Sequence, residues 1–250
     1  MTATLPLGRR ATAEFVGTAA LVAIVVGSGI QATSLSRDVG VQLLANSLAT
    51  VFGLGVLIAL LGPVSGAHFN PAVTLASWWT GRRHGDGLSL RETGVYALAQ
   101  TVGAITGSVV ADGMFAQPLV RFSGHDRSAP HLWLGELVAT AGLVALVFGL
   151  ARIRRDRFAP VAVAAWIGAA YWFTSSTSFA NPAVTIGRAF TDSFAGIAPA
   201  SVPGFLIAQL AGAAAGLGLV AVVFARPADK PATDSVPDDT DAQRELTVAL

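Results

Sequence analysis

The sequence contains no cysteine, and Lys230 is the single lysine among its 16 basic residues. The lack of cysteine excludes disulfides, thiol catalysis and thiolate metal sites. The four histidines are not at metal-ligand spacing, so the sequence predicts no metal and no cofactor. Charged residues make up only 12% of the chain, about half the usual share of a soluble domain. With a net charge of +1 and no basic face, the chain is not expected to bind nucleic acid.

Hydrophobic residues, in contrast, make up 53% of the sequence. An apolar stretch of about 20 residues crosses a bilayer as a helix. We therefore expect an all-α membrane protein surrounded by lipid, with six transmembrane helices at about residues 11–30, 40–62, 92–111, 132–151, 159–177 and 203–225. Two G-x-x-x-G motifs, at Gly103 and Gly107 and at Gly212 and Gly216, predict close helix packing in the third and sixth.

The charges of the loops predict the orientation in the membrane. Arginines are concentrated before the first span, between the second and third, and between the fourth and fifth. The positive-inside rule then places both termini in the cytoplasm. The Ala-, Gly- and Arg-rich composition is typical of a GC-rich bacterial genome, so the predicted location is a bacterial inner membrane. The Pro- and Asp-rich segment 226–250 is predicted to be a disordered cytoplasmic tail.

The chain contains two copies of one unit. AEFVGTAALVAIV from Ala13 matches GELVATAGLVALV from Gly135, and YALAQTVGAITG from Tyr96 matches FLIAQLAGAAAG from Phe205. Each unit has three spans, so the second copy enters the membrane from the opposite side, and the repeats are inverted. We expect one channel domain, 1–225, made of repeats at about 11–111 and 132–225.

Two short segments with matching Asn-Pro-Ala motifs lie between the matched spans. Asparagine is a favoured helix N-cap and proline a favoured first helical residue. Because neither segment is long enough to span, we expect two re-entrant half-helices whose N-termini meet at mid-membrane, with residues 62–69 and 174–180 as the loops before them. Their dipoles would repel cations, and the asparagine amides would donate to a passing oxygen. The motif residues are Asn70, Pro71, Ala72, Asn181, Pro182 and Ala183.

These motifs, with SGAHFNPAVT at Ser65 and the AEFVGT and GELVAT openings, resemble the aquaporin (major intrinsic protein) family over about residues 11–225. The resemblance implies an hourglass fold, passive conduction and a homotetramer with one pore per subunit. It also implies that Glu14 and Glu136 accept hydrogen bonds from the re-entrant loops. The other expected loop-bracing residues are Gln100, Gln209 and His68.

The predicted selectivity filter departs from the family pattern. Most members place an arginine directly after the second Asn-Pro-Ala, where this sequence has Val184. The family's spacing places the other filter positions at Thr50, Ala169 (or Gly168) and Ser178, without the aromatic residue and histidine of water-selective members. Small neutral groups make a wider constriction, suited to water and to uncharged solutes of glycerol or metalloid-acid size.

Two further residues or stretches bear on the solute. Arg188 follows Val184 by one helical turn and is a candidate for the outer vestibule, with an interface contact as the other interpretation. The stretch NPAVTIGRAFTDSFAG resembles aquaporins encoded beside bacterial arsenic-resistance genes, which implies uncharged arsenic species as candidate solutes.

Three alternatives stay open at this point. The first is a strictly water-selective channel, and the second is an inverted-repeat secondary transporter, although the acids deep in the spans are already assigned to loop support. The third is an adhesive or structural protein with a closed pore. We expect no enzymatic activity, because no metal cluster, nucleophile–base pair or phosphate-binding loop is recognisable.

Overall fold

The computed structural model describes residues 5–82 and 87–224, and within them all regular secondary structure is helical, without strands. The predicted tail, 226–250, lies outside the described residues, as does Lys230. The helices are α1 (Leu7–Leu35), α2 (Val39–Ser65), α3 (Pro71–Gly81), α4 (Leu90–Met114), α5 (Pro130–Arg152), α6 (Ala159–Phe173), α7 (Pro182–Arg188) and α8 (Val202–Val223), with 3-10 turns at Asp156–Phe158 and Pro199–Ser201.

Five of the expected spans, in α1, α2, α4, α5 and the helix at Pro199–Val223, are long and apolar enough to cross a membrane. The remaining expected span, the fifth in chain order, is α6, which has 15 residues, or roughly 22 Å of helix. It ends at Phe173 rather than at residue 177, because Thr174 has an extended backbone and already belongs to the loop before α7. The fifth predicted span was therefore about four residues too long.

The glycine motifs lie at two matching helix contacts. A Cβ atom on Gly103 of α4 would lie 2.5 Å from the carbonyl oxygen of Phe15 in α1. A Cβ atom on Gly212 of α8 would lie 2.5 Å from the carbonyl oxygen of Leu137 in α5. Only glycine permits so close an approach of two helix backbones. The pair α1–α4 and the pair α5–α8 are thus built in the same way, as an internal repeat requires.

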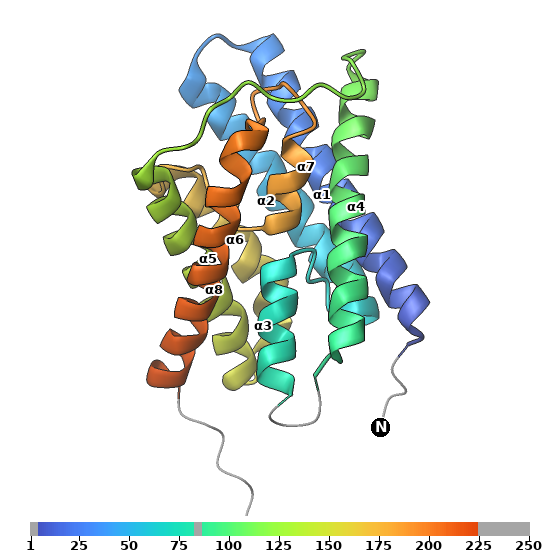
Figure 1. Cartoon of the computed structure of the whole chain (residues 1–250), viewed down its shortest axis with the longest axis vertical. Helices are drawn as coiled ribbons and strands as arrows, with labels where there is room; N and C mark the ends of the chain where they lie inside the picture. Colours follow the sequence, from blue (N-terminus) through green and yellow to red (C-terminus); the bar gives the residue numbers. More distant parts are fainter. Residues whose placement is uncertain (1–4, 83–86, 225–250) are drawn as a thin grey trace, which may run out of the picture.

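The half-helices α3 and α7 lie inside the bundle, one in each half of its height (Figure 1). Helix α1 begins, and α8 ends, at the same end of the molecule, as an even number of spans requires. The loop before α3 is shorter than expected, because α2 continues through Pro63 to Ser65 and stops at Gly66, where φ is +91°. Residues 66–69 alone connect α2 to Asn70.

Candidate functional site

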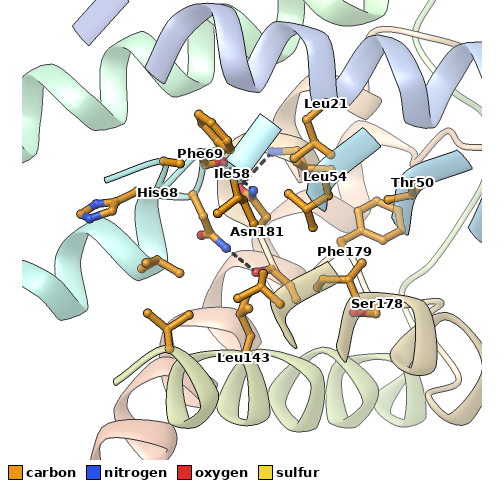
Figure 2. Close-up of a pocket in the computed structure, with 18 of the residues that line it drawn as sticks. Leu21, Thr50, Leu54, Ile58, His68, Phe69, Leu143, Ser178, Phe179 and Asn181 are labelled. Carbon is orange, nitrogen blue, oxygen red and sulfur yellow. Dashed lines mark hydrogen bonds between the residues drawn. The ribbon is translucent and has the colours of Figure 1, made fainter. Parts of the chain in front are cut away.

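A cavity of about 170 Å³ lies around the meeting point of the two half-helices (Figure 2). Leu21, Leu54 and Leu143 belong to its aliphatic wall, which α1, α2, α5 and α6 supply. The two re-entrant loops and α7 supply the polar part. Of the residues predicted for the pore, the cavity is lined by Asn70, Asn181, Thr50, Ser178, Val184 and Arg188. His68, predicted as a loop brace, also lines it.

The two asparagines join the half-helices at their N-termini. The amide nitrogen of Asn70 donates to the carbonyl oxygen of Ala180 at 2.8 Å, and that of Asn181 donates to the carbonyl oxygen of Phe69 at 2.7 Å. Each side-chain oxygen also caps its own helix, accepting from the backbone N–H of Ala72 or Ala183. Since an amide nitrogen carries two hydrogens, each asparagine keeps one further donor beside the cavity.

The loops before the asparagines share an unusual backbone. Ala67 and Phe69 have φ values of 49° and 48°, and Ser178 and Ala180 have 51° and 48°. A left-handed conformation costs a residue with a Cβ atom roughly 1–2 kcal/mol. Four such residues in matching positions require an anchor in the surrounding structure, and two buried glutamates provide it.

Glu14 of α1 anchors the first loop. One of its carboxylate oxygens accepts from the backbone N–H of His68 at 3.0 Å and from the Ser65 hydroxyl at 2.6 Å. The other accepts from the backbone N–H of Phe69 at 2.7 Å and from the Gln100 amide at 2.7 Å. The carboxylate is fully buried, and these four donors compensate its loss of water.

Glu136 of α5 anchors the second loop in the same manner. It accepts from the backbone N–H groups of Phe179 and Ala180, each at 2.8 Å, and from the Gln209 amide at 2.6 Å. Gln209 also donates to Thr185 of α7 at 2.8 Å, so α8 holds both the carboxylate and the half-helix. The corresponding bond in the first repeat runs from Gln100 to Thr74 of α3 at 2.9 Å.

His68 lines the cavity and also contacts α3 and α4. Its Nδ1 lies 3.1 Å from the Thr74 hydroxyl, and its ring packs edge-on against Tyr96, with 5.7 Å between ring centroids. The Tyr96 hydroxyl donates to the carbonyl oxygen of Ser65 at 2.9 Å. His68 is therefore held as part of the first loop, and no carboxylate side chain contacts its ring within the described residues.

The filter residue predicted on α6, Ala169 or Gly168, does not line the cavity in the structure. Ala169 is exposed on the outer face of the helix, and a Cβ atom on Gly168 would lie 2.5 Å from Val51 rather than in the cavity. The residues of α6 that do line the cavity include Ile167 and Tyr171, one helical turn apart. Ala169 lies two residues from each of them, which places it on the opposite face of the helix.

Tyr171 is the aromatic pore residue that sequence reasoning missed. Its side chain is 4% exposed, and its hydroxyl lies 3.2 Å from that of Thr50 on α2. Ser178, in the second loop, has a buried hydroxyl without a hydrogen-bond partner among the described residues. The cavity lining therefore includes Tyr171 together with the predicted residues Thr50, Ser178, Val184 and Arg188.

Arg188 is buried, with 3% exposure, at the last residue of α7. Its Nε donates to the carbonyl oxygen of Ala195, and its guanidinium carbon lies 3.4 Å from the centroid of the Phe179 ring. Phe179 itself lines the cavity (Figure 2). Cation–π contact with a ring and a carbonyl acceptor fix the guanidinium beside the pore.

A second guanidinium, that of Arg127, lies near the same ring. Its carbon is 5.1 Å from the centroid of Phe179, and its Nε donates to the carbonyl oxygen of Gly196 at 3.0 Å. The preceding residue, Asp126, accepts from Ser128 and Ser201, and the hydrogen bonds from Ser128 lower the pKa of its carboxyl. Neither arginine forms a salt bridge within the described part of the chain, and both guanidinium groups lie against Phe179, which lines the cavity.

Comparison with known proteins agrees with this geometry. The family described as MIP, major intrinsic protein, matches residues 1–180, well over half of the chain. The chain belongs to the major intrinsic protein family. The match ends one residue before Asn181, so the second half-helix lies beyond it, although its contacts repeat those of the first.

Individual members of the family are also similar to this chain. An aquaglyceroporin, AqpS, of Rhizobium meliloti (strain 1021) is 49% identical over 214 residues, which cover 86% of this chain and 89% of that protein. A probable aquaporin, AqpM, of Archaeoglobus fulgidus is 30% identical and covers 78% of this chain and 87% of its own length. The X-ray structure of the aquaglyceroporin from Plasmodium falciparum has a TM-score of 0.61 at 23% identity, covering 87% of this chain and 97% of its own, and shows the shared fold.

Proposed function

We propose that this protein is a passive membrane channel for water and small uncharged solutes. The observation that carries the proposal is the reciprocal pair of hydrogen bonds between Asn70 and Ala180 and between Asn181 and Phe69. It presents two amide donors at one point of a cavity whose remaining wall is largely aliphatic. A molecule that loses its water shell there regains hydrogen bonds from the asparagines, and uncharged molecules lose the least on entering.

The same arrangement disfavours ions. Each half-helix N-terminus carries roughly half a positive charge, and the two meet at the asparagines. Arg188 and Arg127 add two full positive charges toward one mouth. Small cations, including hydronium, are therefore repelled at two successive places along the route.

The proposed solutes extend to glycerol or metalloid-acid size, including uncharged arsenic species. Val184 stands where most family members have an arginine. Its side chain is smaller and uncharged, so the constriction is wider at that position. The name of the relative from Rhizobium meliloti, an aquaglyceroporin, supports a solute larger than water.

A second candidate function, strict water selectivity, is favoured by Tyr171. Its ring and hydroxyl narrow the constriction, and it supplies an aromatic residue that the predicted filter does not contain. Stopped-flow light scattering on proteoliposomes decides between the two, by comparing osmotic water flux with the uptake of glycerol and arsenous acid. Fast uptake of the larger solutes supports the wider channel, and fast water with negligible uptake supports water selectivity. Absence of all flux contradicts both.

Coupled transport is disfavoured by the state of the deep acids. Glu14 and Glu136 both accept hydrogen bonds from loop N–H groups and a glutamine, so neither is free to carry a proton along the route. We accordingly propose no gradient coupling and no enzymatic activity.

We further propose a homotetramer in a bacterial inner membrane, with both termini in the cytoplasm. The family supports the tetramer, and the arginines of the loops support the orientation. Only 17% of the apolar window of α2 is buried within one subunit. Its outer face, which lipid or a second copy would cover, includes Leu44, Leu48, Phe52, Val56 and Leu60.

A further inference from the structure

One face of α4 contacts the second half-helix and the segment that follows it, through residues four positions apart. A Cβ atom on Gly187 of α7 would lie 2.7 Å from the carbonyl oxygen of Ala104, so the two backbones are in close contact. The Ser108 hydroxyl donates to the carbonyl oxygen of Gly187 at 2.8 Å. One turn further along α4, the Asp112 carboxylate accepts from the Thr191 hydroxyl at 2.8 Å. Helix α4 therefore holds both the last turn of α7 and the chain beyond it.

The segment that contains Thr191 supplies the carbonyl acceptors of two arginines. Arg188 Nε donates to the carbonyl oxygen of Ala195. Arg127 Nε donates to the carbonyl oxygen of the next residue, Gly196, at 3.0 Å. Gly196 lies directly against Thr191, since a Cβ atom on Gly196 would lie 2.6 Å from the Thr191 carbonyl oxygen. A displacement of Thr191 would therefore also displace the two carbonyl groups.

The helices α4 and α7 have counterparts in α8 and α3, where these polar residues are replaced. When the matched glutamines of α4 and α8 are aligned, Ser108 corresponds to Leu217, which packs against an apolar cluster that includes residues of α3. Asp112 corresponds to Ala221 in the same alignment. The half-helix α3, Pro71–Gly81, carries no arginine, whereas α7 does. The polar contacts thus accompany the half-helix that carries an arginine.

Asp112 is a costly hydrogen-bond acceptor. It is 2% exposed, and its Oδ2 is buried without a hydrogen-bond partner among the described residues. Burying a carboxylate with so few donors lowers the free energy of unfolding. An apolar side chain, as at Ala221, would avoid that cost. The contact between Asp112 and Thr191 is therefore better explained by what it positions than by what it adds to stability.

We propose that Asp112 and Thr191 are positioning residues for the exclusion of cations. Their hydrogen bond holds the carbonyl group of Ala195 in place, and that carbonyl group holds the guanidinium of Arg188 beside the pore. Neither Asp112 nor Thr191 lines the pore, so both act through Arg188. The inference rests on the proposed function, in which Arg188 repels cations.

Flux measurements on proteoliposomes test the pair. Thr191→Val removes the hydroxyl at nearly constant shape, and we expect the ratio of methylammonium uptake to water flux to rise about threefold. Thr191→Ser keeps a hydroxyl and should keep the original ratio. The matched control is Thr106→Val, because the Thr106 hydroxyl donates only to Val102 of its own helix, and its ratio should not change. A merely structural role would lower both fluxes together and leave the ratio as it is.

A double-mutant cycle connects the pair to the arginine. Arg188→Gln alone should raise the ratio about fivefold. Adding Thr191→Val to Arg188→Gln should raise it no further, because the group that the pair positions is then absent. Asp112→Ala should have the same effect as Thr191→Val, and combining the two should add nothing. Additive effects of Thr191→Val and Arg188→Gln would overturn the proposal.

A single cysteine measures the position of the segment without any ion flux, since the chain has no cysteine of its own. Ala195 is fully buried, so Ala195→Cys should react slowly with a small maleimide in detergent. Adding Thr191→Val should speed this reaction about fivefold, and adding Thr191→Ser should not. Ala76→Cys, at a buried position on α3, is the control and should react at the same slow rate with or without Thr191→Val.

The outcomes separate the pair from the proposed function. The proposal is overturned if Thr191→Val leaves the maleimide rate at residue 195 unchanged, or leaves the flux ratio unchanged while Arg188→Gln raises it. In that case the proposed function stands. If Arg188→Gln also leaves the ratio unchanged, the exclusion of cations by Arg188 fails and the proposal fails with it. If Thr191→Val does not fold, Asp112→Ala provides the same measurements.

Discussion

In the first repeat, Glu14 and Gln100 hold residues 66–69, and in the second repeat Glu136 and Gln209 hold residues 174–180 through corresponding hydrogen bonds. The half-helices that follow differ. The seventh residue after Asn70 is Ser77, whereas the seventh after Asn181 is Arg188, which lines the pore. The supports of the midplane are thus symmetric, and the chemistry of the two mouths is not. We propose that conduction depends on the residues that the two repeats share, and that selectivity depends on the residues in which they differ.

The largest effect should come from removing a symmetric support. Glu14→Ala and Glu136→Ala each leave at least three buried donors without an acceptor, which should cost about 3 kcal/mol or more of folding free energy. We expect both variants to lose water permeability and to unfold at much lower temperature, measured by thermal unfolding in detergent. Glu92→Ala, which removes a partly exposed acid paired with Arg10, is the control and should cost less. Normal stability in only one of the two variants would show that the supports are not equivalent.

The next effect concerns the mouth near Val184. Val184→Arg adds bulk and charge at the constriction, so we expect glycerol flux to fall about tenfold while water flux stays within about twofold. Stopped-flow measurements on proteoliposomes provide both values. Val184→Ala, which changes size without charge, should leave glycerol flux equal or higher. Unchanged glycerol flux in Val184→Arg would mean that the constriction lies elsewhere.

Arg188 tests the asymmetry of charge. Arg188→Gln removes a buried positive charge beside the pore, and we expect uptake of ammonium or methylammonium to rise severalfold, by about a factor of five. Arg121→Gln removes an exposed arginine outside the pore and serves as the matched control. Cation uptake that rises equally in both variants would assign the exclusion to overall charge rather than to this position.

The smallest effect is expected at Tyr171. Tyr171→Phe removes the hydroxyl that contacts Thr50 and keeps the ring, so folding should weaken by about 1 kcal/mol and water flux should change by less than about twofold. Thermal unfolding and stopped-flow on the same preparation give the two numbers. A large rise in glycerol flux would indicate that the hydroxyl pair, and not the ring, closes the constriction.

The symmetric part of the site could be predicted because its residues occur twice and because the family resemblance implied a role for the two glutamates. Asn70 and Asn181, and the glutamates and glutamines that support them, each have a counterpart, and the repeat itself indicates where the counterparts meet. Tyr171 was missed because its position depends on where the 15-residue helix α6 begins and on how that helix is rotated. An error of two residues along a helix moves a side chain to the opposite face. Ala169 was placed in the pore for that reason.

The other missed residues lie in loops or at helix ends. Arg127 approaches Phe179 from the segment before α5, at a sequence separation that no local pattern encodes. The sequence indicates no role for Asp112, and only the fold brings its carboxylate within 2.8 Å of the Thr191 hydroxyl. Neither residue has a counterpart in the other repeat that could have indicated its role.

The exchanged hydrogen bonds of the asparagines have a consequence for the order of assembly. Asn70 finds its acceptor 110 residues further along the chain, and Phe69 finds its donor 112 residues further along. During synthesis, the first half-helix therefore enters the membrane before its partner exists, with a polar end that only the second repeat can complete. Contacts between residues so distant in sequence form late in folding. We therefore expect the pore to form late in folding, when the two repeats pack together and each supplies the hydrogen-bond partner of the other's asparagine.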